Sequence, residues 1–159
     1  MKTTLSWTNK LQISKKPEIK IVPINIAGMK AGEIMLVPSA HLIDDFIRQI
    51  PTGQFMDIPT LRKKLAQQYQ AEVTCPITTG FHLRIVAEAA YESFMAGIPM
   101  EQITPIWRVL DATAPTTQKL SYDPSFLYAK RQKEGLPNPA GKSFQKYQSL
   151  KSSINLSPI

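Results

Sequence analysis

The sequence predicts a mainly α-helical fold with a small amount of β structure. Between residues 39 and 95, three stretches carry apolar residues at helical spacing, and each follows a residue that can cap a helix. Short β-branched runs lie on either side of them, at 19–26, 34–38 and 103–110. No internal repeat is visible, so these elements are expected to form one domain with short flanks.

Length and composition restrict the class of protein. A chain of 159 residues has room for one domain whose core needs no metal or disulfide. No apolar run approaches the ~20 residues of a membrane-spanning helix, and the first sixteen residues lack the apolar centre of a signal peptide. The single cysteine, Cys75, has no partner for an internal disulfide. We therefore expect a cytoplasmic protein without membrane contact.

The positive charge lies in the two ends of the chain. The net charge is +7, yet residues 39–136 contain ten Lys/Arg and ten Asp/Glu. Residues 1–38 contain six lysines and two acids, and residues 137–159 contain three lysines and no acid. If nucleic acid binds, a few placed arginines must contact it while the ends supply general attraction. The alternative is that the lysine-bearing ends only keep the protein soluble.

The first 38 residues are expected to form an extended arm with one or two short strands. Residues 1–16 are polar and should be poorly ordered unless Leu5, Trp7 and Leu11 dock on the domain. Residues 19–26 alternate as a strand does, and Pro23 would restrict this strand to a sheet edge. Residues 34–38 are a second short extended run. The domain itself is expected at 39–136, followed by a basic tail at 137–159 that is disordered or docks late.

The first two helices have clear start signals. Ser39 can cap a helix over 40–50, in which Asp44 and Asp45 face away from the core. Asp57 can cap a second helix that begins near Pro59, where proline costs no hydrogen bond. Its buried positions are expected to be Leu61, Leu65 and Tyr69. Its other side carries three cations that are either a solvated face or phosphate contacts: Arg62, Lys63 and Lys64.

The remaining elements follow in order. Thr78 or Thr79 can cap a third helix over 80–95, in which Leu83 is expected in the core. Residues 103–110 predict a strand, residues 111–124 a wing-like hairpin or a loop, and residues 124–134 a short helix ended by Gly135. This order is typical of a winged helix-turn-helix, whose third helix is presented to nucleic acid. A helical bundle with no role in DNA binding would have the same periodicity.

Three segments resemble the C-terminal domain of alkylguanine-DNA alkyltransferases and alkyltransferase-like proteins. IPTGQFMDIPTLRKKLA, from Ile50, resembles the family's entry into its first helix. RIVAEAA, from Arg84, resembles the recognition helix. TPIWRVL, from Thr104, resembles the active-site run Pro-Cys-His-Arg-Val, so that Pro105, Arg108 and Val109 match it. The resemblance implies a winged-helix domain with a role in DNA repair.

The departures from the family change the expected activity. Ile106 stands where the family has its acceptor cysteine, and Trp107 stands where it has a histidine. Isoleucine cannot form a thioether and an indole is not a base, so no alkyl transfer is expected there. Alkyltransferase-like proteins also lack the cysteine and bind damaged duplex DNA without repairing it. That resemblance implies DNA contact by Arg84 and Thr79, and a pocket at the former active site formed by Pro105, Ile106, Trp107 and Arg108.

Each of these residues also has a structural interpretation. Arg84 can pair with Glu88 one turn later, and Arg108 can brace the domain. Trp107 can be a core residue or a surface on which a base stacks.

Two further functions stay open. The winged scaffold can serve as a protein-interaction module instead of binding DNA. A thiol enzyme would use Cys75 with His82, a weak signal because the two side chains must also lie within hydrogen-bond reach. No set of zinc ligands and no cofactor-binding motif is present in the sequence, so neither metal nor cofactor is expected.

Overall fold

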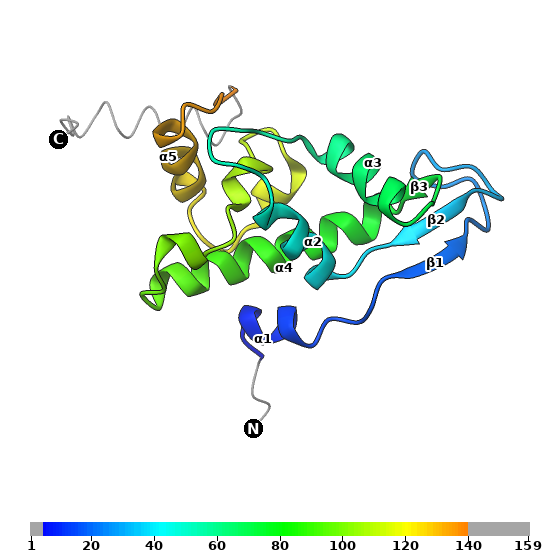
Figure 1. The fold of residues 1–159 in the computed structure, drawn as a ribbon, viewed down its shortest axis with the longest axis horizontal. Helices are drawn as coiled ribbons and strands as arrows, with labels where there is room; N and C mark the ends of the chain where they lie inside the picture. The colour runs from blue at the N-terminus through cyan, green and yellow to red at the C-terminus, as the bar shows by residue number, and fades with distance from the viewer. Residues whose placement is uncertain (1–4, 140–159) are drawn as a thin grey trace.

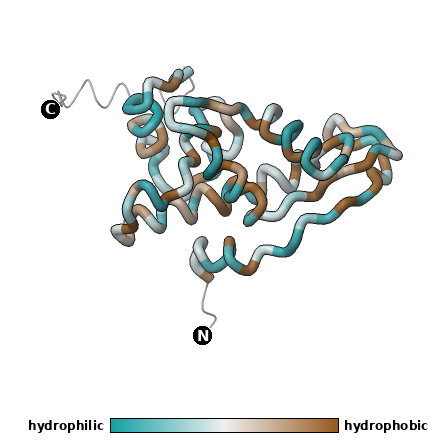
Figure 2. Tube along the Cα trace, viewed as in Figure 1, coloured by the Kyte–Doolittle hydropathy of each residue, from teal (hydrophilic) through white to brown (hydrophobic). Residues whose placement is uncertain are grey.

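Helix α4 (Pro76–Met95) runs through the middle of the molecule (Figure 1). The computed structural model describes residues 5–139. The elements in contact with α4 include α1 (Trp7–Gln12), α2 (Ala40–Arg48) and the 3-10 helices η2 (Ile106–Arg108) and η3 (Pro115–Lys119). Apolar segments recur along α2, β2 and α4 in Figure 2, and the residues that they bury form a common core. The mainly helical prediction is confirmed.

The predicted caps of the first two helices are confirmed. The Ser39 hydroxyl accepts a hydrogen bond from the Leu42 N–H at 3.1 Å at the start of α2. The Asp57 carboxylate accepts one from the Thr60 N–H at 2.8 Å at the start of α3 (Ile58–Gln68). Such side-chain acceptors satisfy N–H groups that have no partner in a helical first turn, which is why these two residues fix the helix starts.

The expected outward position of Asp44 is wrong. Its side chain is 6% exposed and accepts hydrogen bonds from the Thr104 hydroxyl and from Arg48 Nε, the latter at 3.0 Å. A buried carboxylate needs such partners, and Thr104 lies 60 residues away in the chain. The expected burial of Tyr69 is also wrong, because α3 ends at Gln68 and the tyrosine is 38% exposed.

The small sheet has the order β1-β2-β3. Strands β1 (Glu18–Ile21) and β2 (Ile34–Val37) are antiparallel, with Glu18 opposite Val37. Both had been predicted within the N-terminal arm, and Pro23 lies beyond the end of β1. Strand β3 (Val73–Thr74) was not predicted; it pairs in parallel with β2 and lies in the turn between α3 and α4. The arm is therefore joined to the helices by backbone hydrogen bonds.

The predicted strand over 103–110 is wrong. The chain there contains a 3-10 helix, η2 (Ile106–Arg108), closed by the Arg108 N–H on the Pro105 carbonyl at 3.0 Å. The residues from Ile103 to Leu110 are buried except Arg108, so they lack the alternation of a half-buried strand. A short continuous apolar run cannot be assigned by periodicity, and here it crosses the core without a strand beside it.

The winged arrangement is not confirmed. The segment where a hairpin was predicted as one alternative contains η3, so the loop alternative is the correct one. Within residues 5–139, the three-stranded sheet precedes α4 instead of following it. Helix α5 (Ser125–Lys133) is confirmed, with Gly135 just beyond it at φ +73°. Across the same residues, no helix is both long and apolar enough to cross a bilayer. Most of the predicted tail, from residue 140, lies outside the described residues.

Candidate functional site

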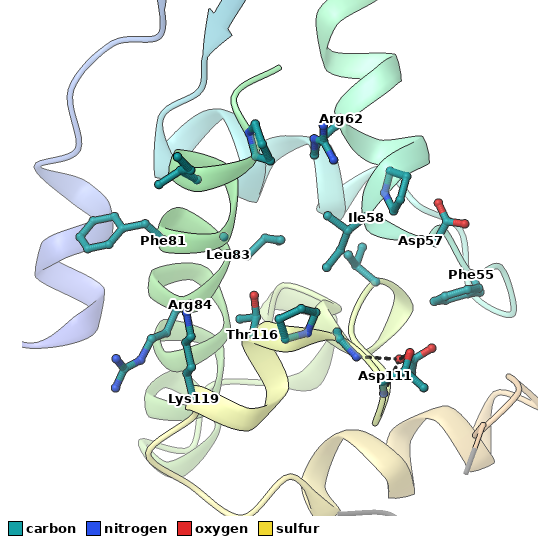
Figure 3. A pocket seen from close by; sticks show the side chains of 18 residues that line it. Phe55, Asp57, Ile58, Arg62, Phe81, Leu83, Arg84, Asp111, Thr116 and Lys119 are labelled. Carbon is teal, nitrogen blue, oxygen red and sulfur yellow. Dashed lines mark hydrogen bonds between the residues drawn. The ribbon is translucent and has the colours of Figure 1, made fainter. Parts of the chain in front are cut away.

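A pocket of about 780 Å³ lies between the first turns of α3, the N-terminal half of α4 and the segment 109–119 (Figure 3). This volume is within the range of small-molecule and cofactor sites. Its walls are largely apolar. The apolar residues that line it include Ile58, Ile77, Phe81, Leu83 and Val109.

Three cations and two carboxylates line the same pocket. Figure 3 shows Arg62 at one end and Arg84 with Lys119 at the other. Asp57 caps α3, and its bonds to Thr60 hold the pKa of its carboxyl below its usual value. Asp111 accepts hydrogen bonds from the Thr113 N–H at 2.8 Å and from the Thr113 hydroxyl at 2.6 Å. Both carboxylates are thus engaged within the protein, while the cations leave donors free for an anionic ligand.

The three predicted phosphate contacts of α3 face in different directions. Arg62 is half-buried, lines the pocket and donates from Nε to the Thr74 carbonyl at 3.3 Å. Lys63 and Lys64 are exposed, and Lys64 lines a separate depression beside α2. Successive helical residues are separated by 100°, so all three cannot share one face. Arg62 and Arg84 line the same pocket from opposite ends, and Lys64 lies on another side.

Thr79 is not at the surface. Helix α4 begins at Pro76, four residues earlier than predicted, and the predicted caps Thr78 and Thr79 lie inside its first turn. The Thr79 side chain is fully buried and donates its hydroxyl to the Cys75 carbonyl at 2.6 Å. The expected contact between Thr79 and DNA is therefore wrong for this conformation, because a ligand on the surface cannot reach the hydroxyl.

Arg84 forms the ion pair with Glu88 that its structural interpretation predicts. Its Nε lies 3.6 Å from a carboxylate oxygen of Glu88, and its guanidinium lies 5.3 Å from the centre of the Trp7 ring. Glu88 is 2% exposed and also accepts hydrogen bonds from the N–H and the hydroxyl of Ser121. Arg84 therefore helps to neutralise a buried carboxylate while its side chain, 40% exposed, still borders the pocket.

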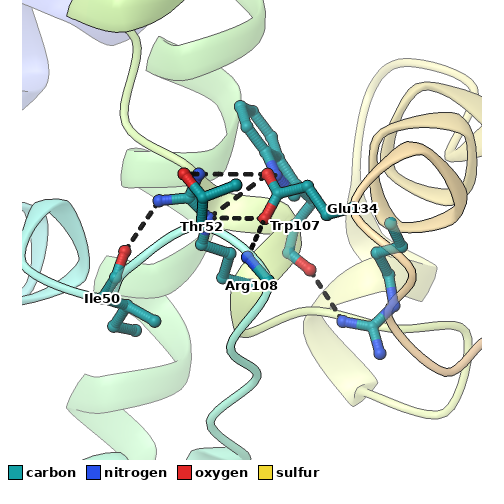
Figure 4. Close-up of polar contacts among 7 residues, drawn as sticks. Ile50, Thr52, Trp107, Arg108 and Glu134 are labelled. Carbon is teal, nitrogen blue, oxygen red and sulfur yellow. Dashed lines mark hydrogen bonds and ion pairs between the residues drawn. The ribbon is translucent and has the colours of Figure 1, made fainter.

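The predicted pocket at residues 105–108 is wrong. Ile106 is fully buried and Trp107 is 4% exposed. None of the four residues lines the pocket between α3 and α4, and the first residue after them that does so is Val109. Trp107 is thus a core residue, which is one of the two roles predicted for it. Its indole N–H donates to a Glu134 carboxylate oxygen at 2.5 Å (Figure 4).

The bracing role of Arg108 is confirmed. Its Nε and Nη2 donate to Glu134 at 2.9 and 3.0 Å, and its Nη1 donates to the Ile50 carbonyl at 2.7 Å (Figure 4). Burial raises the pKa of Glu134, but the hydrogen bonds from Arg108, Gly53 and Trp107 outweigh burial and hold this pKa below its usual value. Glu134 is not among the site residues predicted from the sequence. It is the only acid after residue 123, and an isolated acid in a basic segment was the available signal.

Cys75 and His82 do not form a catalytic pair. Cys75 is buried among Val22, Met29 and Met35, and no hydrogen bond joins it to His82, although both lie among the described residues. Seven residues of helix separate them by roughly 10 Å along its axis. Burial lowers the pKa of His82, so the imidazole is neutral at neutral pH. Among residues 5–139 there is also no group of three potential metal ligands.

Helix α1 is fastened to α4 by Glu92. This carboxylate accepts hydrogen bonds from the N–H groups of Trp7 and Thr8, at 3.1 and 3.2 Å, and from the Thr8 hydroxyl at 2.7 Å. The Thr8 hydroxyl makes the largest contribution to lowering the pKa of Glu92. The Glu92 carboxylate thus caps α1, and α1 in turn places the Trp7 ring beside Arg84.

Glu92→Gln is expected to loosen α1 by about 1 kcal/mol, the usual cost of losing a cap. Hydrogen exchange of the amides of residues 9–12 should accelerate, while that of α4 should not. Glu101→Gln, at an exposed acid of η1 (Met100–Gln102), is the control. Because the folded pKa of Glu92 is lowered, its contribution is complete above the ordinary pKa of glutamate and is lost as pH falls through the folded value. Unchanged exchange at neutral pH would contradict the cap.

Comparison with known proteins adds no assignment: no protein-family model matches the chain, and neither a curated protein nor a solved structure matches it.

Proposed function

We propose that this protein binds duplex DNA through the helix-turn-helix formed by α3 and α4, and that the pocket between them receives a base that has left the stack. The observation that carries the proposal is the pocket itself, apolar in its walls and bordered by cations at both ends. An extruded base needs an apolar slot, and the phosphates that flank it need cations. The resemblance to alkyltransferase-like proteins supports the same function.

Binding without reaction is the form of this function that the lining favours. The residues around the pocket include no cysteine or histidine, and Ile106 is enclosed in the core. Within the described residues, the lining has no thiol to accept a methyl group, no imidazole to activate its hydroxyls, and its two carboxylates are engaged in hydrogen bonds. The protein would therefore recognise an altered base and leave it unchanged.

The test is a salt series of binding to two duplexes, one with a single alkylguanine and the other unmodified. Affinity should fall linearly with the logarithm of salt concentration, and the alkylated duplex should bind more tightly. Arg62→Ala should reduce the salt slope by about one. Lys20→Ala, at an exposed residue of β1 that pairs with Glu18, should leave the slope unchanged. Affinity for neither duplex, at any salt concentration, would exclude the proposal.

Gly80 is a position at which a larger side chain can be introduced into the pocket while helix α4 is retained. It lies in the interior of α4 and lines the pocket, and a Cβ added there would meet no atom within 4 Å. Gly80→Ala should stabilise the protein by about 0.5–1 kcal/mol, since glycine is unfavourable in a helix interior. Gly80→Leu should keep the stability and lose the preference for the alkylated duplex. A leucine variant that retains the full preference would show that the base does not enter this pocket.

The alternative function, a protein-interaction module, is favoured by exposed apolar residues at the edge of the pocket. Ile77 is 58% exposed and Phe81 is 66% exposed. The two functions differ in their response to salt. Burial of apolar surface against a partner protein is strengthened by sulfate, whereas phosphate contacts are weakened by added salt. A complex that is tighter in sulfate would favour a protein partner.

A further inference from the structure

We infer that Phe81, and not Arg84, is the side chain that enters the base stack when duplex DNA binds. This inference rests on the proposed function and names the residue that would carry out the separation of bases. The two side chains differ in the contacts that they already make within the protein and in their exposure on α4.

Arg84 is committed to the protein. Its guanidinium pairs with Glu88, which is 2% exposed, and lies against the ring of Trp7. If Arg84 entered the DNA, it would lose its ion pair with the buried Glu88 carboxylate and its contact with the Trp7 ring. Removing the cation from a buried ion pair is costly, because the carboxylate remains desolvated without its partner.

Phe81 has no comparable commitment. It lies three residues before Arg84 on α4 and is 66% exposed, with an edge contact to the ring of His82 at 5.4 Å between centroids. Figure 3 shows its ring pointing away from the axis of α4. Ile77, one turn earlier on the same side, is 58% exposed. These two residues make an apolar ridge on the N-terminal half of the helix that the fold itself does not use.

The charges around this ridge fit a polyanion. Arg62, Arg84 and Lys119 border the pocket that Ile77 and Phe81 also line, and both carboxylates there are engaged by hydrogen bonds. Proteins that bend or open a duplex insert apolar side chains between base pairs and hold the phosphates with cations beside them. A phenyl ring can stack on the bases that it separates, whatever their identity.

The experiment compares three variants of the full chain on duplexes that carry 2-aminopurine beside an alkylguanine. Fluorescence of 2-aminopurine rises when its stacking is lost. Phe81→Ala should abolish this rise and lower affinity for the alkylated duplex by about tenfold, the effect of losing one stacking contact. Arg84→Gln should retain the rise. Met95→Ala is the matched control, since Met95 is 67% exposed at the other end of the same helix, and it should behave as the wild type.

Three outcomes would overturn the inference. A rise that persists in Phe81→Ala and disappears in a folded Arg84→Gln would assign the role to Arg84, with the proposed function intact. Equal loss of affinity for alkylated and unmodified duplexes in Phe81→Ala, with the rise retained, would make Phe81 a general contact. Absence of duplex binding by the wild type would remove the inference and the proposed function together. Because Phe81 is exposed, its removal should leave the melting temperature unchanged.

Discussion

Arg108→Ala is expected to lower the free energy of unfolding by about 1.5–3 kcal/mol, because it removes the charge-assisted hydrogen bonds to the partly buried Glu134 carboxylate. The side chains of Arg108 and Glu134 are 13% and 11% exposed, and Arg108 also holds the Ile50 carbonyl at 2.7 Å. Urea denaturation measures the effect. Lys20→Ala removes the ion pair with Glu18, whose side chains are 59% and 53% exposed, and should cost at most about 1 kcal/mol.

The same pair predicts a pH dependence with a definite sign. The folded pKa of Glu134 is lowered, so its stabilising contribution is complete above the ordinary pKa of glutamate and is lost as pH falls through the folded value. Wild type and Glu134→Gln should therefore differ most at neutral pH and converge in acid. A loss below 1 kcal/mol for Arg108→Ala, or a difference that grows in acid, would contradict the bracing role.

Arg131→Ala is expected to cost at least about 3 kcal/mol, since each hydrogen bond to a charged group contributes about 1.5–3 kcal/mol. Arg131 is fully buried in α5 and donates from Nη1 to the Trp107 carbonyl at 2.7 Å and from Nε to the Pro137 carbonyl at 2.9 Å. Its guanidinium also lies 4.6 Å from the centre of the Phe55 ring. Thermal unfolding, followed by circular dichroism, measures the loss.

Two comparisons make the Arg131 result interpretable. Lys133→Ala, at an exposed residue of the same helix, should change stability by no more than about 0.5 kcal/mol. Arg131→Met keeps much of the packed volume and should lose less than Arg131→Ala, because only the hydrogen bonds and charge are removed. Equal stability of Arg131→Ala and wild type would mean that the carbonyls of Trp107 and Pro137 find other donors.

The parts of the fold that the sequence predicted are those with local causes. Ser39 and Asp57 each cap a helix within three residues of themselves, so nearby sequence was sufficient. For α4 the predicted caps were Thr78 or Thr79, whereas the helix begins at Pro76. Proline at the first helical position was the better signal, since it gives up no hydrogen bond there.

The parts that failed depend on distant contacts. Asp44 is buried because Thr104, far along the chain, supplies a donor. The segment around Ile106 and Trp107 is apolar, as a buried strand would be. In the structure it crosses the core, and these two buried residues lie in a 3-10 helix. No local pattern distinguishes these outcomes.

Of the predicted contact residues, Arg62 and Arg84 line one pocket from opposite ends. The exposure of Phe81 could not be predicted from the sequence, since an aromatic residue within an apolar helix is usually a core residue. Its exposure depends on which neighbours the fold places over it, and the structure leaves 66% of Phe81 exposed.

Strand β3 limits how far the chain can be shortened. The Glu72 N–H donates to the Ile34 carbonyl at 2.8 Å and the Cys75 N–H donates to the Leu36 carbonyl at 2.9 Å, one on each side of β3. The connection between α3 and α4 is therefore held on both sides by β2. A fragment that starts at Ser39 would retain every residue of the helix pair and lose the strand that fixes its turn. A piece of this protein that preserves the turn between α3 and α4 must therefore begin before Ile34.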